Sequence, residues 1–173
     1  MKNTHAPALS RLPGAIALLA LLFSLAGCGA MDWLQNALYP KSDLEQLRIV
    51  AAPDANQGMA TALDLVFVYD KSAILLLPKS GPEWFDKKKS IVANQPANFV
   101  VVSLEVPPGM IVDAPLPKRS GQPMGAFLYA NYLGRDGQFP LNLTSFTAAE
   151  IRLKAQAIEY VTVAGGKPLV TTP

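Results

Sequence analysis

The most reactive side chain in the sequence belongs to Cys28, its only cysteine. This residue stands in the stretch LLFSLAGCGAMDW, directly after an apolar run and the small pair Ala26-Gly27. A lone cysteine can serve as a redox or metal-binding thiol, as a buried core residue, or as a covalent anchor. The residues on either side of Cys28 decide among these three uses.

The segment before Cys28 has the pattern of a secretory signal peptide. A short basic start with Lys2 and Arg11 is followed by LPGAIALLALLFSLAG, which carries no charge. This run is shorter than the roughly 20 residues that a membrane-spanning helix needs. We therefore expect residues 1–27 to be a leader that is cleaved off, not a permanent transmembrane helix.

The tetrapeptide Leu25-Ala26-Gly27-Cys28 resembles the lipobox of bacterial lipoproteins. The resemblance implies that the Cys28 sulfur carries a diacylglyceryl group and that its new amino group carries a third acyl chain. Because each buried methylene contributes about 0.8 kcal/mol, three chains would give stable anchoring. Lipoprotein sorting retains proteins with Asp after the cysteine at the inner membrane. This sequence has Gly29 there, which favours the periplasmic face of the outer membrane.

Charge gives no indication of a nucleic-acid partner. Two of the 15 basic residues, Lys2 and Arg11, lie in the leader, so the remaining basic residues equal the 13 acidic ones. A formally neutral domain lacks the basic excess that contacts to phosphates require. We interpret the cluster at residues 87–89 as a solvated face of a helix.

The mature chain also has few residues for catalysis. The sole histidine, His5, lies in the leader, which excludes Ser-His-Asp and Cys-His arrangements and the usual zinc sites. A carboxylate pair acting on a glycosidic bond remains as an alternative, either Asp64 with Asp70 or Glu83 with Asp86. Neither pair stands in a supporting motif. We predict a protein that is not an enzyme and binds no metal, no cofactor beyond the covalent lipid, and no small-molecule substrate.

The elements that must position any site are mostly strands. Residues 28–44 are expected to form a lipidated tether, 45–164 a β-sandwich domain and 165–173 a disordered tail. Alternating apolar residues predict strands at 45–52, 62–70, 99–106 and 124–133, and prolines demote 110–117 and 138–144 to edge strands. These short strands between Gly/Pro turns indicate a mainly all-β fold, an antiparallel two-sheet β-sandwich with one short inserted helix.

The inserted helix is predicted at 78–92, where Ser80 can cap it and Pro82 suits its first turn. Residues 147–163 are ambiguous, because Thr147 and Glu150 have capping-box spacing while the following residues alternate strictly. We favour one long strand over a helix, with a bulge near residues 157–158.

The order of these features resembles the TssJ (SciN) family, the outer-membrane lipoproteins of type VI secretion systems. The resemblance covers residues 25–133: the lipobox, the tether, RIVAAPDANQG, LDLVFVYD, a Phe-bearing helix and the VPPG turn. The segment SAILLLPKSGP departs from the family pattern. The resemblance implies a transthyretin-like sandwich with a structural role, tethering the periplasmic domain of an inner-membrane TssM-type protein to the outer membrane.

The family's partner-binding loop maps onto a polar stretch between the first two strands. It comprises Asp54, Asn56, Gln57, Gly58 and Met59. A polar turn with one exposed apolar residue can place that residue in a partner's pocket while amides pair around it. Such residues also make an ordinary solvent-facing turn, so that interpretation stays open.

An envelope lipoprotein that binds a glycan, a lipid or a peptide is the alternative function. In that case a groove would be lined by the aromatic residues of the later segments, namely Trp84, Phe85, Tyr129 and Tyr132. The pair at 84–85 is otherwise expected to cap the core.

Overall fold

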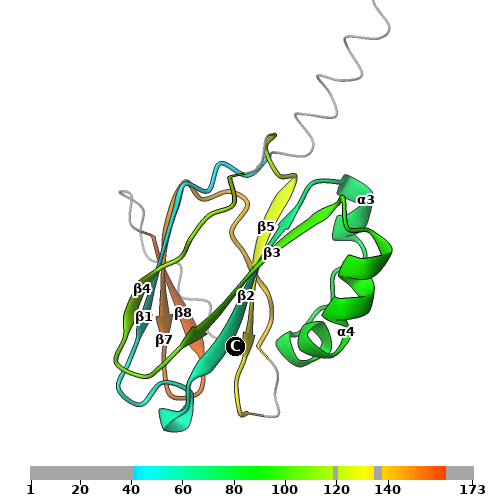
Figure 1. Ribbon diagram of the computed structural model, residues 1–173. Helices are drawn as coiled ribbons and strands as arrows, with labels where there is room; N and C mark the ends of the chain where they lie inside the picture. Colours follow the sequence, from blue (N-terminus) through cyan, green and yellow to red (C-terminus); the bar gives the residue numbers. More distant parts are fainter. Residues whose placement is uncertain (1–40, 119–120, 135–137, 163–173) are drawn as a thin grey trace, which may run out of the picture. The chain divides into compact units, whose positions relative to one another are not determined.

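The computed structural model describes residues 41–118, 121–134 and 138–162. The predicted leader, the lipidation site at Cys28, most of the tether and the predicted tail lie outside these residues. The described chain forms two four-stranded sheets that face each other, with helices over the outer face of one of them (Figure 1). None of the described helices is long and apolar enough to cross a membrane.

The first sheet has the strand order β4-β1-β7-β8. Its strands are β4 (Ile111–Asp113), β1 (Gln46–Ala51), β7 (Ala148–Leu153) and β8 (Ile158–Thr162). The central pair, β1 with β7, is parallel, whereas the two outer pairings are antiparallel. The predicted antiparallel sandwich is therefore confirmed apart from this one parallel pair. A parallel pair needs a long crossover, and here the whole second sheet lies between the two strands in sequence.

The second sheet is antiparallel throughout and has the order β3-β2-β5-β6. Its strands are β3 (Phe99–Val106), β2 (Thr61–Val68), β5 (Gly125–Asn131) and β6 (Leu141–Asn142). Strand β2, predicted at 62–70, is a central strand of this sheet. Its alternate residues are buried on both faces, because Leu63, Leu65 and Phe67 enter the core between the sheets while Val66 and Val68 pack under a helix.

That helix is α4 (Gly81–Asn94), close to the predicted 78–92. The Ser80 hydroxyl caps it by accepting a hydrogen bond from the Glu83 backbone N–H, as its sequence position predicts. Trp84 is fully buried and stacks on Tyr129, with ring centroids 4.8 Å apart. The prediction that Trp84 caps the core is confirmed, although the core it caps is a second one, outside the sandwich.

A four-residue helix that the sequence analysis did not predict, α3 (Lys71–Ile74), precedes α4. Its N-cap is Asp70, whose carboxylate accepts a hydrogen bond from the Ser72 backbone N–H at 2.8 Å. The signal was present as an Asp-x-Ser turn, but the run of leucines after it has no helical periodicity.

A buried ionic network fixes α4 to the sheet. Asp64, only 1% exposed, accepts hydrogen bonds from the Trp84 indole at 2.8 Å, the Lys88 ammonium at 2.7 Å and the Ser103 hydroxyl at 2.6 Å. The interpretation of residues 87–89 as a solvated face is therefore wrong for Lys88. A buried carboxylate needs a charged partner, and Lys88 supplies one from the covering helix.

The predicted long strand at 147–163 is instead a hairpin. Strands β7 and β8 pair antiparallel around a turn at residues 154–157. The turn is closed by the Lys154 N–H, which donates to the Ala157 carbonyl at 2.9 Å. Alternation along both strands predicted strand structure correctly but could not reveal the reversal, because the turn contains no glycine or proline.

Candidate functional site

The predicted binding loop forms a short 3₁₀ segment, η1 (Ala55–Gly58), at one end of the sandwich. Hydrogen bonds tie it to three other loops at the same end (Figure 1). The Gly109 N–H donates to the Ala52 carbonyl at 3.1 Å, and the Asn56 N–H donates to the Lys154 carbonyl at 3.0 Å. The Leu133 N–H donates to the Asn56 side-chain oxygen at 2.8 Å. We call this end, comprising residues 52–60, 107–111, 132–134 and 154–157, the η1 end.

The backbone of η1 adopts left-handed conformations at three successive residues. The φ angles are 48° at Asn56, 58° at Gln57 and 82° at Gly58. Glycine accepts this region freely and asparagine tolerates it, whereas other L residues are strained there by roughly 1–2 kcal/mol. Gln57 therefore occupies a costly conformation, and such strain persists only where the surrounding structure enforces it.

Asn56 is the residue that enforces this geometry. Its side chain is 2% exposed, and its amide nitrogen donates to the Ala60 carbonyl at 3.2 Å while its amide oxygen accepts from Leu133. Of the five residues predicted to contact a partner, Asn56 is therefore buried, and its side-chain amide bonds within the domain. The other four, Asp54, Gln57, Gly58 and Met59, are exposed.

Exposed apolar side chains gather at the η1 end. Met59 is 56% exposed, as its place in the predicted turn suggests. Three further exposed residues were not predicted: Met110 (50%), Ile111 (64%) and Leu133 (58%). They come from two other segments, 107–111 and 132–134, which hydrogen bonds tie to the segment 52–60. The arrangement offers apolar side chains and backbone amides, which suits protein contacts rather than bond chemistry.

The described chain begins at the opposite end of the sandwich from η1 (Figure 1). There the Ser42 N–H donates to the Pro123 carbonyl at 2.8 Å, and Ser42 is 3% exposed. The amide of Gln122 also contacts the carboxylate of Asp43. Residues 42–43 are therefore held firmly to the domain, so the preceding segment leaves from a fixed point.

The four aromatic residues proposed for a ligand groove do not meet at one surface. Trp84 and Tyr129 are buried beneath α4, and Phe85 is partly buried beside them. Tyr132 lies in the core between the sheets, where its hydroxyl donates to the Ala157 carbonyl at 3.2 Å. Burial raises the pKa of the Tyr129 and Tyr132 hydroxyls above the ordinary value for tyrosine.

Three of the four carboxylates considered for catalysis have structural partners. The Ser72 hydroxyl and N–H hold the pKa of Asp70 below its usual value, and the Lys87 ammonium, 2.8 Å away, lowers that of Glu83. Asp64 is bound within the ionic network. Among the described residues there is no cluster of three side chains suited to a metal ion.

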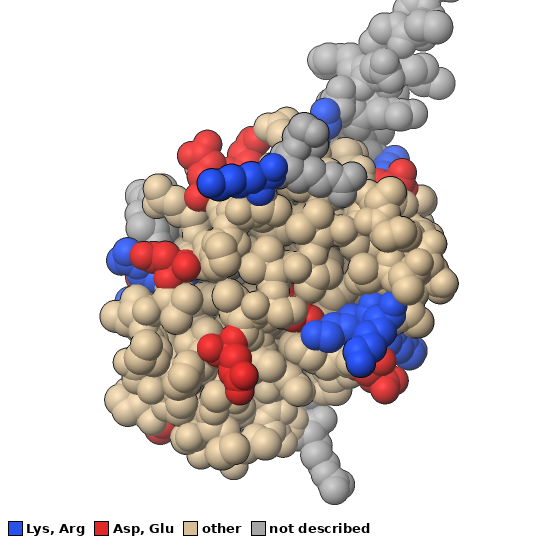
Figure 2. Space-filling model, in the orientation of Figure 1, with Lys and Arg blue, Asp and Glu red and all other residues tan. Residues whose placement is uncertain are grey.

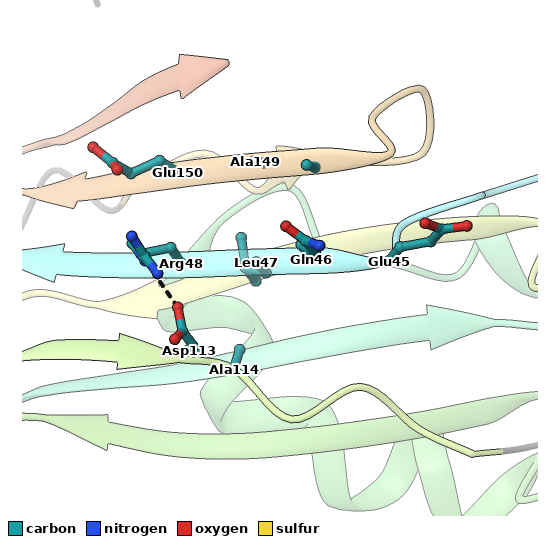
Figure 3. A pocket seen from close by; sticks show the side chains of 9 residues that line it. Glu45, Gln46, Leu47, Arg48, Asp113, Ala114, Ala149 and Glu150 are labelled. Atoms are coloured by element: carbon teal, nitrogen blue, oxygen red, sulfur yellow. Dashed lines mark hydrogen bonds and ion pairs between the residues drawn. The ribbon is translucent and has the colours of Figure 1, made fainter. Parts of the chain in front are cut away.

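A hollow of about 370 Å³ lies on the outer face of the first sheet (Figure 3). Arg48 crosses it and pairs with Asp113 at 2.9 Å, which lowers the pKa of that carboxyl. Glu150, on the other side, pairs with Arg152 at 2.9 Å. Figure 2 likewise shows basic side chains standing next to acidic ones on a largely uncharged face. Paired charges of this kind are typical of a solvated sheet surface.

No protein-family model matches the sequence, and neither does any curated protein. Solved structures do match, and the class of fold that they define is a two-sheet β-sandwich. The T6SS lipoprotein TssJ1 from Pseudomonas aeruginosa is 18% identical, with a TM-score of 0.50 over 73% of this chain and 100% of that chain. Serratia marcescens Lip, a membrane-bound component of the type VI secretion system, is 13% identical, with a TM-score of 0.48 over 68% of this chain and 94% of its own.

The chain thus has the fold of TssJ1. The resemblance to the TssJ family that the sequence predicted is confirmed at the level of the fold. The β-sandwich class is confirmed with it.

Proposed function

We propose that this protein is an outer-membrane lipoprotein of a type VI secretion membrane complex. It is acylated at Cys28, and its η1 end binds the periplasmic domain of an inner-membrane TssM-type protein. The observation that carries the proposal is the fold shared with the whole length of TssJ1, a T6SS lipoprotein. The lipobox adds the anchor, because a lipobox cysteine is the acceptor of a diacylglyceryl group.

The positions of the two ends suit a protein that bridges two bodies. Residues 29–41 connect the anchor to the domain and reach at most about 45 Å when extended. They join the domain at Ser42, opposite the η1 end. An anchor that joins the domain at this end leaves the η1 end free for a partner in the periplasm.

The η1 end is suited to binding because it is held rigid before any partner arrives. The left-handed turn at residues 56–58 is fixed by Asn56, so little conformational entropy remains to be lost on association. Met59 presents a flexible, polarizable side chain from this rigid turn. The exposed residues Asp54 and Gln57 supply polar groups beside it.

Affinity purification of the acylated protein from envelope extract tests the partner. The wild-type chain is expected to recover a TssM-type protein, and Met59→Asp is expected to reduce that recovery at least tenfold, because a carboxylate would be buried in an apolar contact. Asn94→Asp is the matched control, since it adds the same charge at an exposed residue that ends α4 next to residues 76–77, away from η1. Equal recovery with Met59→Asp and Asn94→Asp would show that the η1 end is not the binding surface.

Membrane fractionation tests the anchor separately. Cys28→Ser removes the acceptor sulfur, so the protein is expected to move from the membrane pellet to the soluble periplasmic fraction. A Cys28→Ser protein that stays in the membrane pellet would overturn the assignment of Cys28 as the anchor.

A further inference from the structure

A second exposed apolar surface surrounds α3. Leu75, which ends the helix, is 86% exposed, and Leu76 is 50% exposed. We call residues 71–76 the α3 knuckle. Leucines exposed at the tip of a turn are suited to a membrane interface, where apolar side chains enter the boundary between headgroups and acyl chains.

The α3 knuckle lies at the end of the domain where the tether joins it. Ser42 is hydrogen-bonded to Pro123, and the next residue, Met124, donates its N–H to the Val68 carbonyl at 2.7 Å. Val68 pairs with Gly125, and the side chain of Ile74 lies beside Gly125. Neighbouring residues therefore lead from Ser42 to α3, and Figure 1 shows the start of the described chain and α3 at the same end.

We propose that the α3 knuckle contacts the lipid leaflet that holds the acylated Cys28. This inference rests on the proposed acylation of Cys28 and adds a second membrane contact made by the folded domain. Residues 29–41 keep the domain within about 45 Å of the membrane, which raises the local concentration of the knuckle at the surface. The contact sets the orientation of the domain, because it turns Leu75 toward the lipid and the η1 end away from it.

Two acidic groups at this end have partners within the domain. Asp70 accepts hydrogen bonds from Ser72, and Asp43 accepts one from the Gln122 amide. The contact with the leaflet rests on the exposed side chains of Leu75 and Leu76. A membrane fits this end better than a protein partner does, because the segment that carries the anchor joins the domain here.

A fluorescent label tests the contact, using the acylated full-length mature protein. Acylation consumes the thiol of Cys28, the only native cysteine, so one introduced cysteine is the sole labelling site. Leu75→Cys reports on the knuckle, and Leu133→Cys, 58% exposed at the η1 end, is the matched control. Each variant is labelled with a polarity-sensitive dye and inserted into vesicles of phosphatidylethanolamine and phosphatidylglycerol with brominated acyl chains.

Quenching by the brominated chains is expected to be about threefold or more stronger at position 75 than at position 133. Equal quenching at both positions, or none at 75, would overturn the proposal. A second sample is the unacylated Cys28→Ser protein, labelled at position 75 and measured without vesicles. If aqueous iodide fails to quench the dye in this sample, the proposal is also overturned, since another part of the chain or a second copy would then cover the knuckle. Mass spectrometry of the same sample reports acylation, so failure of the anchor and failure of the knuckle contact are distinguished.

Discussion

Replacing Asn56 by alanine should loosen the whole η1 end. The substitution removes two side-chain hydrogen bonds, to Ala60 and from Leu133, each worth about 1 kcal/mol. It also leaves a left-handed backbone, with φ of 48°, on a residue that tolerates it less well than asparagine, which adds about 1 kcal/mol. We expect the free energy of unfolding to fall by about 3 kcal/mol, which lowers Tm by roughly 10 °C in a domain of this size.

Thermal unfolding followed by circular dichroism measures this change. Gln57→Ala is the matched control, because Gln57 is also left-handed, with φ of 58°, but its side chain is exposed. The Tm of Gln57→Ala should change by less than about 2 °C, since glutamine and alanine have a similar conformational cost in the left-handed region. Equal losses from the two substitutions would refute the assignment of Asn56 as the residue that fixes the turn. Recovery of the partner by Asn56→Ala, measured below its Tm, should fall as the turn loses its rigidity.

Two further predictions concern the stability of the sandwich. Asp64→Asn should lower the free energy of unfolding, measured by urea denaturation, by about 2–4 kcal/mol, because it removes the counter-ion of Lys88 from a buried site. Asp113→Asn, in the exposed pair with Arg48, is the control and should leave the urea midpoint unchanged. Equal effects of the two substitutions would contradict the burial argument. Burial raises the pKa of Tyr129 and Tyr132, so above pH 10 the unfolded chain loses protons that the folded chain retains. Stability should be constant with respect to these two groups below pH 10 and fall above it, and a urea midpoint that does not change between pH 9 and pH 11 would be inconsistent with this.

The parts of the fold that depend on local periodicity could be predicted from the sequence. Strand β2 is a β-prone run that is apolar at six of its eight residues, and the helix that follows Ser80 has both a cap and a proline at its start. The hairpin turn at residues 154–157 could not be predicted, because its backbone is held by long-range partners. The carbonyls of Lys154 and Ala155 accept hydrogen bonds from Asn56 and Gln57, about one hundred residues earlier in the chain.

The sequence predicted the part of the candidate site that lies in one loop, but not the parts that other loops contribute. The polar residues of 54–59 mark a turn, and Met59 is exposed as expected. Burial of Asn56 and the clustering of Leu133 and Met110 near η1 depend on which loops the topology brings together. The role of Lys88 was missed for the same reason, because its partner, Asp64, lies on β2, and only the packing of α4 against the sheet brings the two together.

The measurement that tests the central claim most directly is mass spectrometry of the N-terminal peptide of the exported protein. The claim is that a lipid on one sulfur converts this β-sandwich into a membrane-anchored component. The account predicts a peptide that begins at Cys28 and carries a diacylglyceryl thioether and an N-linked acyl chain. A free Cys28 thiol, or a leader still attached at residues 1–27, would contradict it.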